Sequence, residues 1–205
     1  MQFIKTILLG LICTIVYGIL QDQITARLCV EYFTIGHPRV FGETEDPTLL
    51  ALGWGVLATW WVGLILGVPL AVIARIGSHP KVDASRLVKP ILILMASVGL
   101  VALIAGIVGY LVGLAGGEAL LGNRLANAVP RAKHAAFLAD AFAHMAAYGA
   151  GFGGGLLCWA WTWRIRRVAN RTLLSSQLER LRNENLSLIE EAAKQKRARD
   201  QADIL

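Results

Sequence analysis

The chain has 205 residues, of which 56% are hydrophobic and only 17% are charged, and its formal net charge is +6. Soluble domains carry about 25% charged residues, so the composition excludes an ordinary soluble domain and indicates an integral membrane protein. Ten of the 20 Lys and Arg residues lie after position 163, together with six acids, so this tail carries +4 of the net charge. The positive charge is therefore concentrated in one segment and does not by itself predict nucleic-acid binding.

Four apolar segments, at 4–20, 49–74, 87–115 and 135–163, are long enough to cross roughly 30 Å of hydrocarbon as helices. They predict an all-α integral membrane protein, with a four-span transmembrane domain over 1–163. A basic juxtamembrane segment and a short coiled-coil tail are expected over 164–205. The first segment has an alternative interpretation as a signal peptide cleaved near Gly18, which would leave three spans.

Positive charges predict the orientation of these spans. Eleven Lys and Arg residues fall on the side that holds both termini and the 75–89 connection, and five fall on the other side. Because cytoplasmic loops are enriched in Lys and Arg, both termini are expected in the cytoplasm of a bacterial-type inner membrane. The basic stretch at 124–133 is the part of the sequence that disagrees with this orientation.

Two exported connections follow from that topology. In the first, 21–48, alternating polarity over 24–35 favours an extended or interfacial segment. Glu31 and His37 lie there, and single loop residues of these types are more often solvated than functional. The second connection, 116–134, is expected to contain a short amphipathic helix around 118–129.

The spans contain many glycine pairs at small-xxx-small spacing, which predict close packing of helix backbones. These pairs are Gly63/Gly67, Gly109/Gly113, Gly113/Gly117, Gly149/Gly153 and Gly151/Gly155. The three cysteines form no C-x-x-C motif, which argues against a membrane thiol oxidoreductase.

The ionisable residues of the fourth span form its main polar group. Asp140, His144 and Tyr148 are spaced i, i+4, i+8 and so share one helix face. An ionisable residue inside a span is by default a functional-site hypothesis. In one interpretation the Asp140 carboxylate simply holds the His144 imidazole. In another the pair relays or senses protons, because His titrates near neutral pH.

A third interpretation is a divalent metal site, since imidazole and carboxylate groups suit zinc, iron or manganese. The additional ligands would come from the exported side, where the candidates are His134, Glu118, His37 and Glu31. A divalent metal is then the only cofactor that the sequence suggests. One D-x-x-x-H half-site is a weak signal, so all three interpretations stay open.

The end of the fourth span is marked by a sharp change in composition. Trp159, Trp161 and Trp163 precede a cluster of arginines, as expected for an aromatic belt at the cytoplasmic interface. Anionic lipid headgroups are the expected partners of that cluster, which comprises Arg164, Arg166, Arg167 and Arg171.

The tail carries a short heptad pattern. With Leu178 at position a, Asn185 also falls at a, and Leu174, Leu181 and Leu188 fall at d. Leucine at d with one asparagine at a favours a parallel two-stranded coiled coil in fixed register. The alternative is a single solvated helix or a helix that docks on another partner.

Signatures of common enzymes are absent: the sequence contains no G-x-S-x-G, Walker A or H-E-x-x-H motif. We therefore expect a non-catalytic, oligomeric inner-membrane scaffold, sensor or accessory subunit. The alternative is a metal- or proton-handling transporter or enzyme centred on Asp140 and His144.

Overall fold

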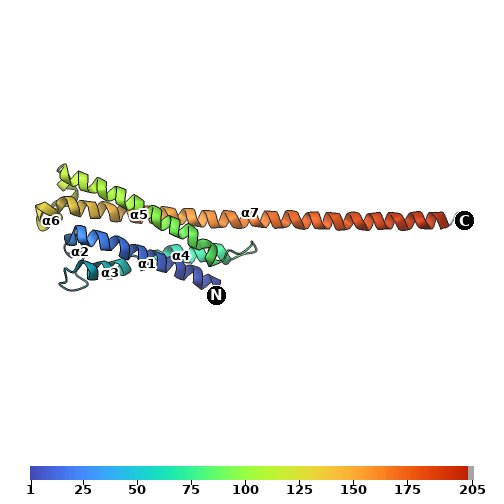
Figure 1. Ribbon diagram of the computed structural model, residues 1–205, viewed down its shortest axis with the longest axis horizontal. Helices are drawn as coiled ribbons and strands as arrows, with labels where there is room; N and C mark the ends of the chain where they lie inside the picture. The colour runs from blue at the N-terminus through green and yellow to red at the C-terminus, as the bar shows by residue number, and fades with distance from the viewer. Residues whose placement is uncertain (203–205) are drawn as a thin grey trace. The chain divides into compact units, whose positions relative to one another are not determined.

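The computed structural model describes the backbone of residues 1–202 and the side chains of residues 1–194. Helices and the connections between them make up this part of the chain, which contains no strand (Figure 1). The elements in chain order are α1 (Gln2–Leu28), α2 (Val30–Thr34), α3 (Pro47–Leu57), α4 (Trp60–Arg75), α5 (Ala84–Leu114), η1 (Gly117–Leu121), α6 (Gly122–Ala128), η2 (Arg131–Lys133) and α7 (His134–Ala202). The predicted all-α fold is confirmed.

Within residues 1–202, three helical segments are long and apolar enough to cross a membrane: Gln2–Leu28, Pro47–Arg75 and Ala84–Leu114. The fourth predicted span, 135–163, lies within α7 and is not among them. The physical reason is that Asp140, His144 and a run of glycines lower the mean hydropathy of that stretch. The coarser prediction of a multi-pass arrangement of apolar helices is therefore consistent with the structure, and the count of four stays a prediction.

The chain divides into two compact units. One comprises Met1–Ile76 and Lys81–Trp163, and the other comprises Gly77–Pro80 and Arg164–Leu205. α7 contributes to both units as one continuous helix. In the second unit, Arg166 is only 5% exposed and donates hydrogen bonds to the carbonyls of Pro80 (2.8 Å) and His79 (2.9 Å). Its guanidinium is thus held by the connection that follows α4, whereas Arg164, Arg167 and Arg171 are exposed.

The second predicted span is two helices rather than one. α3 ends at Leu57 and α4 begins at Trp60, and Thr59 between them has φ −120° and ψ −21°. At the other end of α3, the Asp46 carboxylate accepts from the backbone amides of Thr48 and Leu49, and Pro47 occupies the first turn. This is a strong helix start, because the cap satisfies amides that lack partners within the helix. The interruption frees the carbonyl of Ala58 for a side chain of α7, as described below.

The connection between the first two predicted spans is shorter than expected, because α1 continues through Leu28. The expectation of an extended segment over 24–35 is wrong: α1 occupies its first half and α2 occupies most of the remainder. Only Cys29, with φ −147°, has extended backbone between them. The consequence is that Asp22 lies on a helix that is long and apolar enough to cross a membrane, and it is 5% exposed. In the second connection, the predicted short helix is present as η1 and α6.

Glycines allow α1 to approach α3 and α4 at backbone distance. A Cβ at Gly63 would lie 2.8 Å from the Cα of Leu11, and one at Gly55 would lie 2.6 Å from the Cα of Ile19. Gly109 and Gly113 meet α7 in the same way at Leu138 and Ala135. The glycine pairs Gly63/Gly67 and Gly109/Gly113 therefore pack as predicted. Gly149, Gly151 and Gly153 have nothing within 4 Å of an added Cβ, so packing does not explain those positions.

This contrast predicts the effect of adding one methyl group. Gly18→Ala places a Cβ 2.7 Å from the carbonyl oxygen of Gly55, and we expect this overpacking to lower the free energy of unfolding by about 1–3 kcal/mol. Gly149→Ala, in an open position of a helix, is expected to raise it by about 0.5–1 kcal/mol. Unfolding of both variants in bicelles is the measurement, and equal effects would contradict the packing described here.

Candidate functional site

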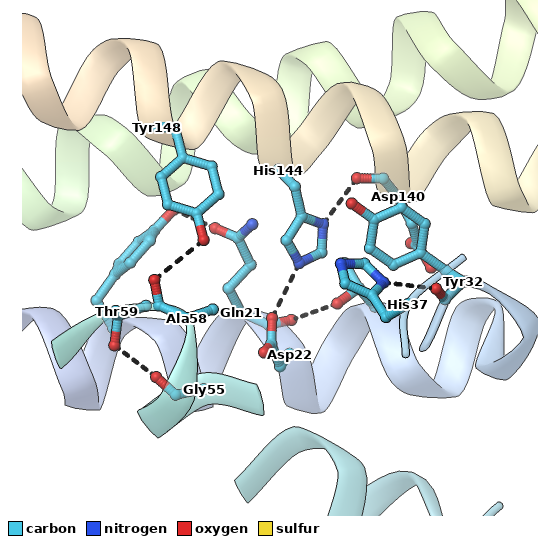
Figure 2. A network of polar contacts seen from close by, with 12 residues as sticks. Gln21, Asp22, Tyr32, His37, Gly55, Ala58, Thr59, Asp140, His144 and Tyr148 are labelled. Atoms are coloured by element: carbon cyan, nitrogen blue, oxygen red, sulfur yellow. Dashed lines mark hydrogen bonds and ion pairs between the residues drawn. The ribbon is translucent and has the colours of Figure 1, made fainter. Parts of the chain in front are cut away.

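The site is a buried contact between α1 and α7. His144 Nε2 lies 3.0 Å from Asp22 Oδ1, and the side chains are only 14% and 7% exposed (Figure 2). The other ring nitrogen, Nδ1, lies 2.8 Å from the backbone carbonyl oxygen of Asp140, one turn earlier in α7. The imidazole also stacks on the Tyr32 ring at a centroid distance of 4.8 Å. Both nitrogens and one face of His144 are therefore fixed.

Hydrogen-bond chemistry determines where protons reside in this contact. A carbonyl oxygen only accepts, so Nδ1 of His144 must carry a hydrogen and donate it to Asp140. Two protonation states then satisfy the 3.0 Å contact between Asp22 Oδ1 and His144 Nε2. Either protonated Asp22 donates to neutral His144, or imidazolium His144 donates to ionised Asp22. In both states one proton lies between these two atoms.

A cavity of about 100 Å³ adjoins this pair. Its walls come from α1, α2, α3, α4, α5 and α7, together with the segment after α2. Besides His144, the rings that line it are Tyr17, Tyr32, Phe33, His37, Trp54 and Tyr148. Tyr148 donates to the carbonyl of Ala58 at 3.1 Å, where the second span is interrupted. The cavity thus connects the Asp22–His144 pair with this break.

Asp140 is placed differently from the prediction. The interpretation in which its carboxylate holds His144 is wrong, because the partner on its own helix is the Asp140 backbone carbonyl and the carboxylate partner is Asp22. Asp140 is 0% exposed, and neither carboxyl oxygen has a hydrogen-bond partner in the described part of the chain. The i, i+4 spacing leaves the two side chains on one face, but the ring turns back to the carbonyl.

The other predicted residues divide between two places. His144 and Tyr148 line the same cavity, as their spacing predicted. His134 instead pairs with Glu118: Nδ1 lies 3.1 Å from the carboxylate, and Nε2 lies 3.0 Å from the carbonyl of Val129. This pair holds η1 and the end of α6 against the start of α7. Among the described residues, no group of three His, Cys, Asp or Glu side chains is arranged to hold a metal ion.

Cys29 lies close to the site, and its environment makes its thiol unreactive. It is 0% exposed, and its thiol lies 3.4 Å from the Glu31 carboxylate as a donor. Burial, followed by this hydrogen bond and the negative charge of Asp140, raises the pKa of the Cys29 thiol to about 12. The reactive form is the thiolate, and at pH 8 it would be about one part in ten thousand.

We therefore expect Cys29 to resist alkylation at pH 8. In a variant that keeps Cys29 and replaces Cys13 and Cys158 by alanine, maleimide should label the native protein slowly and the denatured protein fully. The native rate should rise with pH, because the thiolate fraction grows tenfold per unit below the raised pKa. Native labelling as fast as that of the denatured chain would contradict this environment.

Asp22 is the residue that sequence reasoning missed. The apolar run ends at Leu20, so Asp22 was assigned to the exported loop. A signal was present: polar or small residues continue at helical spacing from the span into the loop. These residues are Thr14, Gly18, Asp22 and Thr25, and the structure places all four among the buried residues of α1.

Comparisons of the chain with protein-family models, with curated proteins and with solved structures find no match.

Proposed function

We propose that this protein is a proton-responsive sensor component of a bacterial-type inner membrane, in which the proton shared by Asp22 and His144 controls how α1 packs against α7. The observation that carries the proposal is the 3.0 Å contact between two buried titratable groups on different helices. The proposal includes four spans, with 135–163 as the fourth and both termini in the cytoplasm. No catalytic step is assigned to it.

Loss of the shared proton would make the interaction between Asp22 and His144 unfavourable. Without it, an ionised Asp22 carboxylate would face the lone pair of His144 Nε2, because Nδ1 holds the only remaining ring hydrogen. Attraction becomes repulsion in a site that excludes most water, where electrostatic effects are strong. α1 and α7 would then separate locally, and this is the conformational signal that we propose.

Other groups around the pair determine how readily the proton leaves. On α1 the neighbouring titratable side chain is Tyr17; on α7 they are Asp140 and Tyr148. α2 contributes Tyr32 and also carries Glu31, whose charge acts on Asp140, and the segment after α2 contributes His37. α3 and α5 present no titratable group to the cavity. No Lys or Arg lines the cavity, so the negative groups are not neutralised by a fixed positive charge.

The test is the pH dependence of stability. In wild-type protein, the free energy of unfolding in bicelles should fall by about 1–3 kcal/mol once the pH is raised far enough to remove the shared proton, because the contact is lost with it. In Asp22→Asn the amide donates to neutral Nε2 and has no proton to release, so this fall should disappear. Glu45→Gln, an exposed acid, serves as the control for removing one negative charge.

A fall of equal size in wild type and in Asp22→Asn would show that other groups cause the pH dependence. In that case the proposed proton switch would be wrong. A flat wild-type profile would lead to the same conclusion.

Self-association through the tail is a second proposed property, and a separate observation favours it. The predicted heptad leucines all lie on the helical α7 with more than half of their surface exposed: Leu174 (51%), Leu178 (67%), Leu181 (57%) and Leu188 (57%). A stripe of exposed leucines on one helix is typical of a surface that binds another helix. Asn185 at position a favours a second copy in parallel register.

Anionic headgroups stay the proposed partners of Arg164, Arg167 and Arg171.

A further inference from the structure

A larger groove lies between α1, α5 and α7, with a volume of about 560 Å³. This volume falls within the ~300–1,000 Å³ typical of small-molecule sites. Its walls are largely aliphatic, and the large residues among them are Leu20, Ile24, Leu28, Leu103, Ile107 and Leu111. Among the residues whose side chains the structure describes, Asp140 is the only acid that lines it, and no Lys or Arg does. The groove is therefore largely apolar and contains one acidic group.

The Asp140 carboxyl group has no hydrogen-bond partner in the described part of the chain. Both Asp140 carboxyl oxygens are buried without a hydrogen bond, and within the described side chains no other residue has such atoms. Buried polar groups in folded proteins are nearly always hydrogen-bonded, because an unpaired one costs several kcal/mol in an apolar environment. The carboxyl therefore calls for a ligand group that donates to it.

We propose that this groove binds a lipophilic amine, with its ammonium group on Asp140 and its alkyl chain along the aliphatic walls. An ammonium supplies up to three donors, and its positive charge favours the ionised form of the Asp140 carboxyl, which only accepts. No side chain of opposite charge lines the groove to compete for it, among the described residues. The hydrocarbon chain of a bilayer lipid would also fit the walls, but it would leave Asp140 unpaired.

The groove is a different cavity from the one beside Asp22 and His144, although Asp140 also contacts His144 through its backbone carbonyl. The groove and the smaller cavity share only Tyr17 and Gln21 as lining residues, and the Tyr17 hydroxyl donates to the Gln21 side chain. That hydrogen-bonded pair on α1 lies where the two cavities adjoin. Amine binding does not require the Asp22–His144 proton, so either proposal can fail while the other stands.

The experiment compares two ligands that differ only in the headgroup. Radiolabelled dodecylamine and dodecanol are equilibrated at neutral pH with full-length protein in phosphatidylcholine nanodiscs, and binding to empty nanodiscs is subtracted. We expect saturable binding of one dodecylamine per chain, about tenfold or more tighter than dodecanol, because only the ammonium forms a charge-assisted hydrogen bond with Asp140. Equal affinities in the wild-type protein would overturn the proposal without any variant.

Two variants localise the binding. Asp140→Asn should reduce dodecylamine affinity to that of dodecanol. Gly99→Leu should reduce binding of both ligands, because a Cβ there enters the groove and meets only the Tyr17 ring, at 3.7 Å. Glu45→Gln removes an exposed acid elsewhere and should leave both affinities unchanged. Dodecylamine binding that persists in Asp140→Asn or in Gly99→Leu would place the ligand outside this groove.

Discussion

Asp22→Ala is expected to lower the free energy of unfolding by about 2–3 kcal/mol near neutral pH, whereas Asp22→Asn should lower it by less than about 1 kcal/mol. The alanine variant leaves His144 Nε2 without its 3.0 Å partner in a region where the imidazole is only 14% exposed. The asparagine variant keeps a donor of nearly the same shape. Chemical or thermal unfolding in bicelles gives both values.

The control is Glu45→Ala, which truncates an exposed acid of the loop before α3 and should change stability by less than about 0.5 kcal/mol. The comparison separates a hydrogen-bond role from a charge role. If asparagine and alanine were equally harmful at position 22, the negative charge rather than the shared hydrogen bond would hold α1 to α7.

The tail should provide the second large effect. We expect Leu181→Ser to weaken self-association roughly a thousandfold, because each dimer loses two buried leucines and each contributes about 2 kcal/mol. Leu186→Ser is the matched control: Leu186 is exposed on the same helix but falls at position b, outside the a/d stripe. Sedimentation equilibrium or mass photometry in nanodiscs measures the difference.

Deletion of 177–205 extends this test, since it removes most of the heptads. We expect the oligomeric state of the deletion variant to be lower than that of the full-length protein. An unchanged mass after the deletion would show that the tail does not mediate association. Equal losses in Leu181→Ser and Leu186→Ser would mean that the helix associates through a different face from the one that the heptads define.

The arrangement of apolar helices could be predicted because long hydrophobic runs have few other structural solutions. The interruption of the second span could not, because the residues around Thr59 are as apolar as the rest. Close packing at Gly63 and Gly67 also followed from their spacing. Whether a glycine meets a neighbour depends on tertiary structure, and Gly149 and Gly153 have the same spacing with open space beside them.

The site was predicted in part. His144 was identified because an ionisable residue stands out within an apolar run, and Tyr148 follows it at helical spacing. Its partner Asp22 was missed because it comes just after the first apolar segment, which ends at residue 20. Hydropathy places the end of the span there, although the helix continues to Leu28. The pairing also joins residues 122 positions apart, which local sequence patterns do not encode.

The most direct test of the central claim is the ¹⁵N NMR signal of the His144 ring in nanodiscs as pH is varied. The account predicts that Nδ1 stays protonated throughout, because it donates to the Asp140 carbonyl. Nε2 should change from a protonated or hydrogen-bonded signal to a free lone-pair signal as pH rises, and Asp22→Asn should abolish that change. A neutral His144 that carries its hydrogen on Nε2 rather than Nδ1, or an identical titration in Asp22→Asn, would contradict the shared-proton contact.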